Sequence, residues 1–460
     1  MSEHNQQLLD RIEAAVDAEF AGMLRDLAEL VSIPSVSSDP TKAAELERAA
    51  LLVQAFFSAL GFQTSIEVAV GEDGAEGAPA VIARGPKYEG APTVLLYAHH
   101  DVQPAPHTPG WVSPPFQMEV RGDRIFGRGT SDDGAGVIVH LGALRALQAL
   151  PDQTPLNVVV FIEGEEEIGS PTFGAFLDKF HDRLAADVII VADSSNWTVD
   201  VPAITSTLRG VVSVDVTVKV ADHAVHSGMF GGPLLDALTV ASRLIATLHD
   251  DAGDVAVPGL TGSNEAEVDW DEETYRADAS VLEGVELAGT GDLAARVWSK
   301  PAIGVIGIDA PSTAESANAI VPEATFRLSM RVPPSQKVED AAEALAAHLK
   351  NSAPFGATVE VAVQEMGPAY TADLDHEVVK DYREALSEAW GTQAVAIGQG
   401  ASIPFIAKFE EAFPEAIIIV TGIEDPATKA HGENESQSMK ILKNATVAEA
   451  LFLAGLAETK

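Results

Sequence analysis

Short runs of consecutive apolar residues constrain the fold of this chain more than any other feature of its sequence. These runs span residues 94–97, 158–162, 188–191 and 416–420. A strand that is apolar on both faces suits a sheet that is buried between two layers of helices. Patterns typical of helices lie among the runs, at residues 41–60, 133–150, 171–184 and 376–390. Because the two patterns alternate, we predict an α/β domain with a mostly parallel sheet between helices.

A second kind of strand pattern begins near Arg209. Apolar residues alternate with polar ones along residues 212–220, 326–332 and 359–363. Such strands have one wet face, which predicts an antiparallel sheet that helices cover on one side only. The helical patterns that would cover this sheet lie at residues 233–249 and 337–350. We therefore expect an inserted α+β domain at residues 208–367, between two parts of the α/β domain at residues 1–207 and 368–460.

Within the expected insertion, residues 250–300 are acidic, rich in glycine and only weakly periodic. We interpret this stretch as a long surface excursion of the inserted domain. Trp270, Tyr275 and Trp298 are its candidate anchors, because large aromatic side chains supply much buried area.

The charge of the chain excludes several classes of function. The 460 residues carry a formal net charge of −40 at pH 7. Such a surface repels phosphate backbones and anionic lipids, so we expect neither nucleic acid nor membrane as a partner. Two explanations of the acidity stay open: solubility or salt adaptation, or carboxylates that cations hold together.

The sequence contains no cysteine, which excludes disulfides, thiolate zinc sites and cysteine nucleophiles. Any metal must therefore be held by histidines and carboxylates, as in hydrolytic zinc, manganese or cobalt sites. Residues 1–7 are polar and lack the apolar core of a signal peptide. No apolar run approaches the roughly 18 residues of a membrane span. We therefore expect a cytoplasmic protein.

Ionisable side chains gather where the predicted buried strands end, which is where ligands bind in open α/β sheets. The residues that follow these strands are His99, His100, Asp101, Glu163, Glu165, Glu166, Glu167 and Asp193. In addition, Gly127–Gly134 forms a turn that opens a helix, and His431 lies in a loop before the last helix.

Each of these residues has an ordinary explanation when it is taken alone. A single histidine is often a core residue, Asp132 and Asp133 could cap the following helix, and Glu165–Glu167 could be a solvated turn. Together, however, carboxylates that converge on one buried rim would repel one another unless a cation were present. Since histidines are within reach, the pattern favours a two-metal site with one shared carboxylate.

Four segments resemble a known family, the dinuclear zinc metallopeptidases that include carnosine dipeptidases, aminoacylases, carboxypeptidase G and succinyl-diaminopimelate desuccinylase. The matching segments are Tyr97–Pro104, Gly127–Gly134, Glu163–Ser170 and His226–Gly232, in the family's order. The resemblance extends from about Leu30 to the C-terminus. It implies a zinc-peptidase-like catalytic domain, and it implies that the inserted domain is the family's lid or dimerisation domain.

The resemblance also implies a metal centre with two Zn²⁺ per subunit, where Mn²⁺ or Co²⁺ are alternatives. The implied ligands are His99 and Asp193 for one ion, Glu167 and His431 for the other, and Asp132 as the bridge between them. Glu166 would be the general base. Asp101 would hydrogen-bond His99 and fix its tautomer.

In the lid domain, the resemblance implies residues that bind the substrate. His226 would be supplied by the partner subunit to stabilise the tetrahedral oxyanion, so the protein would be a homodimer through this domain. Arg331 would clamp the substrate's terminal carboxylate with two hydrogen bonds. Asn318 and Ser402 would line the substrate pocket.

The resemblance is greatest to the dipeptidase branch, so we expect a small peptide as the substrate. A deacylase of N-acyl amino acids with the same machinery is the alternative. A non-catalytic peptide-binding protein on the same fold is a second alternative, against which the intact ligand and base set counts. Gly134, Ala319 and Ala401 depart from the dipeptidase pattern. None of them is a metal ligand, so they bear on the substrate rather than on the reaction.

Overall fold

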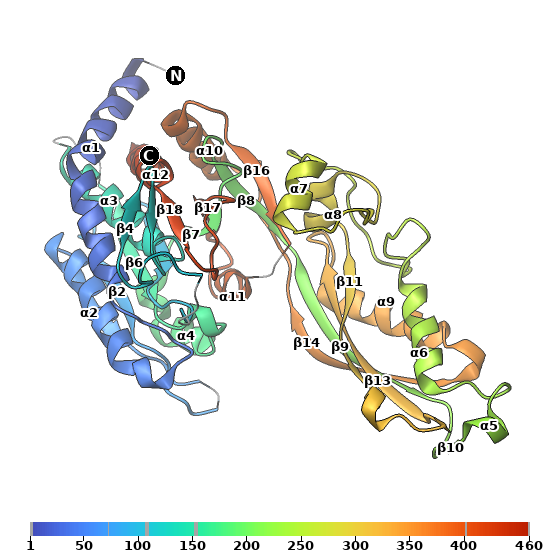
Figure 1. Cartoon of the computed structure of the whole chain (residues 1–460). Helices are drawn as coiled ribbons and strands as arrows, with labels where there is room; N and C mark the ends of the chain where they lie inside the picture. Colours follow the sequence, from blue (N-terminus) through green and yellow to red (C-terminus); the bar gives the residue numbers. More distant parts are fainter. Residues whose placement is uncertain (1–2, 72, 106–109, 151–154, 401–402, 459–460) are drawn as a thin grey trace. The chain divides into compact units, whose positions relative to one another are not determined.

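The structure is a computed structural model that describes residues 3–71, 73–105, 110–150, 155–400 and 403–458. The chain divides into two compact units, whose helices and strands Figure 1 draws, with labels where there is room. Unit 1 comprises Met1–Ser206, Ala372–Ala396 and Pro404–Lys460, and unit 2 comprises Thr207–Thr371 and Ile397–Ile403. The domain boundaries expected after residues 207 and 367 stay a prediction.

Unit 1 is built on a mixed sheet. The spatial order of its strands is β1 (Gln63–Glu67), β2 (Ala80–Arg84), β6 (Asn157–Glu163), β3 (Thr93–His99), β7 (Val188–Ser195), β17 (Ile417–Glu424) and β8 (Ala203–Leu208), and β16 (Val395–Gln399) also pairs with β8. β15 (Tyr370–Thr371) pairs with the last two residues of β8, which like β15 belong to unit 2. The central pairs β6–β3, β3–β7 and β7–β17 are parallel. The flanking pairs β1–β2, β2–β6 and β17–β8 are antiparallel. The predicted α/β class is confirmed, with the parallel strands at the centre of the sheet.

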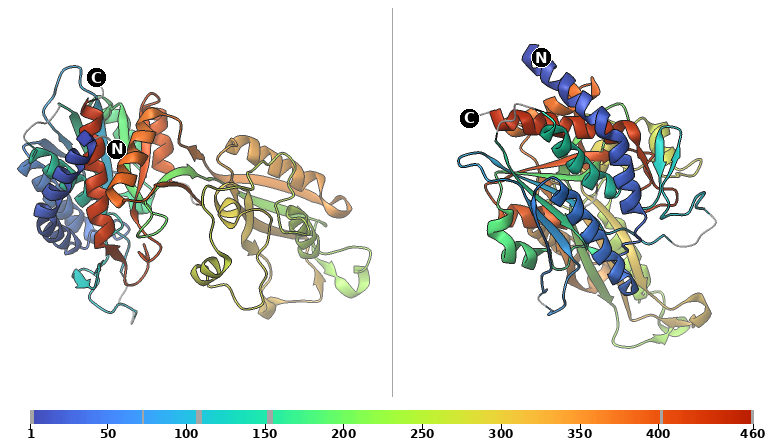
Figure 2. Two further views of the ribbon diagram at one scale, coloured as in Figure 1. Left: turned by 90° about the horizontal axis from the view of Figure 1, so that it is seen from above. Right: turned by 90° about the vertical axis from the view of Figure 1, so that its left-hand side faces the viewer.

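Helices cover both faces of this sheet (Figures 1 and 2). One face carries α1 (Glu3–Val31), α2 (Ala43–Ala59), α3 (Gly134–Gln148), α10 (Glu377–Trp390) and α12 (Met439–Glu458), and the other carries α4 (Phe173–Leu184) and α11 (Pro404–Ala412). Successive residues of a strand point to opposite faces, and β3 illustrates this. Leu96 belongs to the core under α3, whereas Tyr97 packs on Phe173 of α4 and Phe405 of α11.

A small antiparallel sheet joins two distant segments of unit 1. It consists of β4 (Glu119–Arg121), β5 (Arg124–Phe126) and β18 (Ser436–Ser438). β5 pairs with β18, with Phe126 opposite Ser436. This pairing fixes the loop that contains His431 next to the turn that begins at Gly127.

Unit 2 contains an antiparallel sheet with one covered face. Its strands are β11 (Ala302–Asp309), β13 (Glu323–Val332), β9 (Gly210–Lys219) and β14 (Thr358–Gly367), in this spatial order, and its covering helices are α6 (Ala237–Ile245) and α9 (Val338–Asn351). Val214 and Leu328 are buried beneath these helices, whereas Asp215 and Arg327 are paired on the opposite face. The one-sided sheet predicted from the alternating pattern is confirmed.

The remaining elements are short. They are β10 (Val225–His226), β12 (Ala319–Ile320), α5 (Ser227–Phe230), α7 (Glu272–Asp278), α8 (Leu293–Trp298) and 3-10 turns at Pro40–Lys42, Glu166–Ile168, Ala246–Leu248, Thr313–Glu315 and Pro354–Gly356. α7 and α8 belong to the expected surface excursion. The ring of Trp270 contacts that of Tyr275 in a tilted arrangement and that of Trp298 edge-on, with ring centroids 5.8 and 5.1 Å apart. Among the described residues, no helix combines the length and the apolar character that crossing a bilayer requires.

Candidate metal centre

The register of the central strands brings ionisable residues to one edge of the unit 1 sheet. In the parallel pair β3–β6, His99 lies opposite Glu163. In the parallel pair β3–β7, Tyr97 lies opposite Val191, so Asp193 follows at the level of His99. These positions are at the carboxyl ends of neighbouring parallel strands, the usual location of a ligand site in such a sheet.

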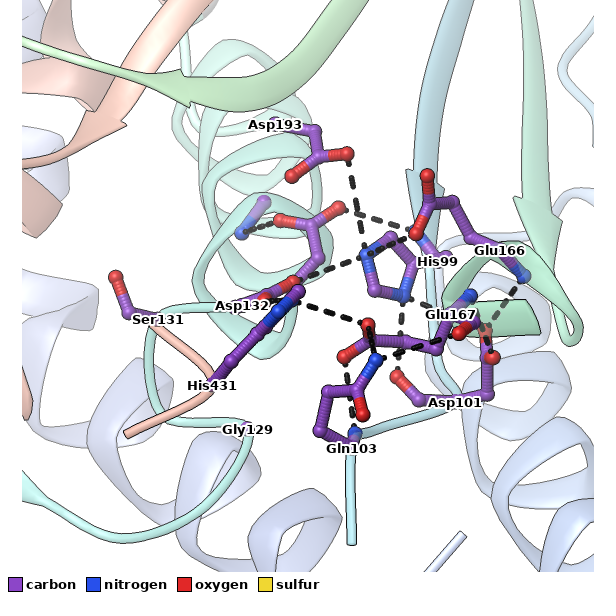
Figure 3. A network of polar contacts seen from close by, with 12 residues as sticks. His99, Asp101, Gln103, Gly129, Ser131, Asp132, Glu166, Glu167, Asp193 and His431 are labelled. Carbon is purple, nitrogen blue, oxygen red and sulfur yellow. Dashed lines mark hydrogen bonds and ion pairs between the residues drawn. The ribbon is translucent and has the colours of Figure 1, made fainter. Parts of the chain in front are cut away.

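His99 is fully buried, and both of its ring nitrogens face oxygen atoms (Figure 3). Nδ1 lies 3.0 Å from the carbonyl oxygen of Asp101 and 3.4 Å from the carboxylate of the same residue. Because a carbonyl oxygen can only accept, Nδ1 carries a proton. Nε2 lies 3.2 Å from Asp132 and 3.9 Å from both Glu166 and Asp193. A single imidazole nitrogen thus faces three carboxylates.

His431 forms the second half of the cluster. Its Nε2 lies 2.9 Å from Oδ2 of Asp132 and 3.2 Å from Oε2 of Glu167. The other oxygen of Asp132, Oδ1, is the one that faces His99. Asp132 therefore lies between the two histidines and directs one carboxylate oxygen to each (Figure 3).

Two groups of side chains have the spacing of metal ligands. In each group the ligand atoms all lie within 4.8 Å of one another, and the groups are His99, Asp133 and Asp193, and Asp132, Glu167 and His431. The structure thus brings together all five residues that the resemblance implies as ligands, and it adds Asp133. That these residues are ligands stays a prediction, to which the proposal below returns.

The donor set fits a pair of divalent cations. Nε2 of His99 is buried and, within the described residues, makes no hydrogen bond. A buried nitrogen that faces only carboxylate oxygens is stable only if a proton or a cation lies between them. Imidazole nitrogens and carboxylate oxygens are the ligands that zinc takes in proteins when thiolates are lacking.

The pKa values of the residues in the cluster are shifted in the directions that an excess of negative charge causes. Burial raises the pKa of Asp193 well above its usual range, and the neighbouring Glu166 and Asp132 add to this effect. Burial alone would lower the pKa of His99, but the carboxylates of Asp101 and Asp132 beside its ring raise it well above its usual range. Hydrogen bonds to Asp132 and Glu167 raise the pKa of His431 to about 10. The cluster therefore retains protons where cations would otherwise balance its charge.

Glu166 differs from its neighbour Glu167 in its surroundings. Its carboxylate belongs to neither group of ligand spacing. Burial raises the pKa of Glu166 to about 7, although the His99 ring opposes this shift. Glu167 instead accepts hydrogen bonds from the main chain and the side-chain amide of Gln103, at 2.9 and 2.7 Å. The two adjacent carboxylates are thus held in different environments.

Asp101 holds both the histidine and the glutamate turn. In addition to its contacts with His99, its carboxylate accepts hydrogen bonds from the main-chain N–H groups of Glu166 and Glu167, both at 3.1 Å. Burial opposes its ionisation, but the hydrogen bond with His99 lowers the pKa of Asp101 below its usual value. Asp101 therefore fixes two parts of the cluster relative to each other.

The turn that carries Asp132 is held from a distant part of the chain. The Glu435 carboxylate accepts hydrogen bonds from the main-chain N–H groups of Gly129, Ser131 and Asp132 at 3.1, 3.0 and 3.2 Å. Arg128 pairs with the same carboxylate at 2.7 Å. Because Glu435 follows the His431 loop, this network couples both halves of the candidate centre.

Sequence reasoning missed several of these supporting residues. Gln103, Glu435 and Arg128 lie inside segments that were noted, but nothing in their spacing shows which groups they contact. Asp133 has the helix-capping role that the sequence allowed for it. Its carboxylate caps α3 by accepting a hydrogen bond from Gly136 N, and it accepts another from His99 N. His100 turns away from the cluster, and its Nε2 lies 2.8 Å from the Pro79 carbonyl oxygen.

Three of the predicted substrate residues, His226, Asn318 and Arg331, lie in unit 2. His226 is exposed on β10, which pairs with β12, and the main-chain oxygen of Asn318 accepts a hydrogen bond from Ser227 N at 3.0 Å. The structure therefore brings His226 and Asn318 into one ribbon. Arg331 is half-buried on β13. Ser402 lies outside the described residues. The roles of these residues stay predictions.

A cluster of histidines and carboxylates at the strand ends of an α/β sheet is the kind of site that metal-dependent hydrolases use. A family model described as peptidase family M20/M25/M40 matches residues 95–454. The chain therefore belongs to this peptidase family, which confirms the resemblance found in the sequence.

Individual relatives are similar over most of the chain. The sequence is 34% identical over 436 residues to the cysteinylglycine-S-conjugate dipeptidase of Corynebacterium striatum, with 94% of each protein covered. It is 26% identical over 359 residues to the Beta-Ala-His dipeptidase of Homo sapiens, which covers 75% of this chain and 70% of that protein. The crystal structure of human carnosine dipeptidase 1 is similar with a TM-score of 0.74 and 25% identity, and it covers 98% of this chain and 99% of that one.

Proposed function

We propose that this chain is a two-zinc dipeptidase, which hydrolyses the amide bond of a small peptide. The observation that carries the proposal is the position of Asp132, whose two oxygens face His99 and His431. A carboxylate that bridges two ions needs this arrangement. The relatives named as dipeptidases support the class of substrate.

The proposed ligands are His99 and Asp193 for one ion, Glu167 and His431 for the other, and Asp132 for both. When bound, the two ions would lower the pKa of a water molecule and polarise the amide carbonyl. Zinc is the proposed metal, and manganese and cobalt are the alternatives that the same donor atoms accept.

Glu166 is the proposed general base. It takes a proton from the attacking water and returns it to the leaving amine. Two observations support this role: its carboxylate lies outside both groups of ligand spacing, and burial raises its pKa to about 7. A base of this pKa is partly ionised at neutral pH and still holds a proton strongly enough to deliver it.

The groups proposed to bind the substrate belong to unit 2. Arg331 binds the C-terminal carboxylate of the peptide, and Asn318 and Ser402 line the pocket. His226, contributed by the partner subunit, donates a hydrogen bond to the oxyanion that forms when water attacks the carbonyl. The proposal thus includes a homodimer formed through residues 208–367, in a cytoplasmic protein.

A substrate comparison tests the proposal. The zinc-loaded protein is incubated with a set of dipeptides and with N-acetyl and N-succinyl amino acids, and released amino acid is measured. We expect hydrolysis of dipeptides, its loss after treatment with a chelator, and its return with zinc, manganese or cobalt. Faster release from the N-acyl compounds would instead identify a deacylase. Activity that survives complete metal removal would refute the two-metal proposal.

The assigned base is tested by Glu166→Gln, which keeps the shape of the side chain but removes its basicity. We expect turnover to fall about 10²- to 10⁴-fold while the metal content of the protein is unchanged. Glu411→Gln, at an exposed position of α11, is the matched control and retains activity. A fully active Glu166→Gln variant would contradict the assignment.

A further inference from the structure

Unit 2 contains one arginine whose charge is balanced within the sheet, on the face that helices leave uncovered. Arg327 of β13 lies opposite Asp215 of β9. The carboxylate accepts two hydrogen bonds from the Arg327 guanidinium, from Nε at 2.6 Å and from Nη2 at 2.8 Å. This fork-shaped pairing is the usual way in which a protein neutralises an arginine.

Arg209 is a second arginine of unit 2 with very different partners. It stands immediately before β9 and is only 7% exposed. Its Nε donates to the carbonyl oxygen of Gly400 at 3.1 Å, and its Nη1 lies 3.3 and 3.5 Å from the carbonyl oxygens of Lys300 and Arg296. These partners are neutral, and among the described residues no carboxylate forms an ion pair with Arg209. The guanidinium is therefore hydrogen-bonded but its charge is not balanced.

The positive charge of Arg331 adds to that of Arg209. It lies on β13 opposite Val211, which is two residues after Arg209. Within the described residues, the Arg331 guanidinium has no hydrogen bond and no ion pair. Burial, followed by the charge of Arg331, lowers the pKa of Arg209 to about 10. Two guanidinium groups thus repel each other at one end of a sheet in a chain of net charge −40.

A buried, unbalanced cation beside a second cation is unfavourable in the free protein, and an anion placed at the second cation relieves it. Arg209 is too deeply buried to present its whole fork to a ligand, whereas Arg331 is half-buried and has free donors. The ligand that this arrangement fits is therefore an anion bound by Arg331 and attracted by both charges.

Arg209 also holds the segment that precedes the predicted pocket residue Ser402. A Cβ atom on Gly400 would lie 2.9 Å from Nη2 of Arg209 and 3.1 Å from the carbonyl oxygen of Val297. A Cβ atom on Gly398 would lie 2.5 Å from Cβ of Trp298. A side chain at position 398 would therefore collide with Trp298 of α8, and one at position 400 would press on the Arg209 guanidinium and on Val297.

We propose that Arg209 is a positioning residue that makes the protein selective for peptides with a free C-terminal carboxylate. It acts through its unbalanced positive charge, which strengthens the binding of the carboxylate at Arg331, and through its hydrogen bond to Gly400. The excursion at residues 250–300 has a part in this, since its carbonyl groups at Arg296 and Lys300 hold the Arg209 side chain. This inference rests on the dipeptidase function proposed above.

The experiment compares a dipeptide with the same dipeptide capped as a C-terminal amide, and it uses two substitutions of Arg209. Arg209→Gln removes the positive charge, whereas Arg209→Lys keeps it. Both variants lose the guanidinium that hydrogen-bonds to the carbonyl oxygens of Gly400, Lys300 and Arg296. We expect both variants to have a lower Tm than the wild type. Only Arg209→Gln should raise KM for the free dipeptide, by about tenfold, with kcat changed less than about twofold and with KM for the amide unchanged.

The matched control is the double variant Asp215→Asn, Arg327→Gln. It removes a balanced pair from the same sheet without altering the net charge, so the preference for the free dipeptide should equal that of the wild type. If Arg209→Gln and Arg209→Lys change the preference equally, or if neither changes it, Arg209 is only a structural residue and the inference is wrong. A wild-type protein that hydrolyses neither peptide would instead refute the proposed dipeptidase function.

Discussion

The candidate metal centre of unit 1 and the arginine pair of unit 2 are opposites in charge. The first gathers carboxylates around His99 and His431, so its excess charge is negative. The second places Arg209 near Arg331 without a carboxylate partner among the described residues, so its excess charge is positive. Both are exceptions to the rule that buried charges are paired within the protein. The comparison teaches that the sign of an unbalanced charge indicates the kind of ligand, which we propose to be metal cations in unit 1 and a carboxylate in unit 2.

The largest effect is expected from removing the carboxylate of Asp132, which the two halves of the candidate metal centre share. Asp132→Asn keeps the size of the side chain but leaves the two histidines without their common anion. We expect the loss of both metal ions and a fall of peptide hydrolysis to background, because neither half of the centre is complete without Asp132. Metal content and activity are measured together. Asp123→Asn, at an exposed position between β4 and β5, is the control; a variant at Asp132 that retains two ions would show that it is not the bridge.

The excess negative charge of the candidate metal centre also predicts how the stability of the metal-free protein depends on pH. Burial raises the pKa of both Glu166 and Glu435 to about 7. A carboxyl group whose pKa is higher in the folded than in the unfolded state stabilises the fold at low pH. That stabilisation is lost as the pH rises from about 4.5 through 7, at a cost on the order of 1–3 kcal/mol per group.

The measurement is the Tm of chelator-treated and zinc-loaded protein between about pH 5 and about pH 8, within the window set by those shifts. The Tm of the metal-free protein should fall over this range, and zinc should reduce the fall, because a cation stabilises the ionised carboxylates. Equal slopes for the two forms would mean that the carboxylates do not sense the metal.

Salt is expected to have the smallest effect, and it should stabilise the fold while it weakens the binding of the substrate. Raising the ionic strength from about 0.05 to about 0.5 M screens repulsion among the 69 acidic residues, so Tm should rise by a few degrees. The same screening weakens the attraction of the arginine pair for a carboxylate, so KM for a free dipeptide should rise by about two- to threefold. An uncharged osmolyte of matched osmolality is the control. A KM that is independent of salt would argue against an electrostatic role for Arg209.

Much of the fold followed from the periodicity of apolar residues. The runs that became β3, β6, β7 and β17 are apolar on both faces because helices cover both sides of that sheet, and the alternation along β9 and β13 reflects one open face. The antiparallel flanks of the unit 1 sheet were not predicted, since a buried strand has the same composition whichever direction its neighbour runs. α1 was also not predicted, although Leu9, Ile12 and Val16 form its buried stripe.

The sequence by itself determined which residue types are available and at which ends of which strands they stand, because strand direction and local spacing are properties of a short segment. The family resemblance selected His99 and Asp132, but only the tertiary structure decided how each of two neighbours meets the cluster. His99 faces it and His100 does not, and Asp132 lies between the histidines while Asp133 caps α3. It also decided that Glu435 holds Ser131 across a separation of 304 residues, and that Arg209 has carbonyl groups as partners. The physical reason is that such contacts arise where distant segments close on one another, and no local pattern records that closure.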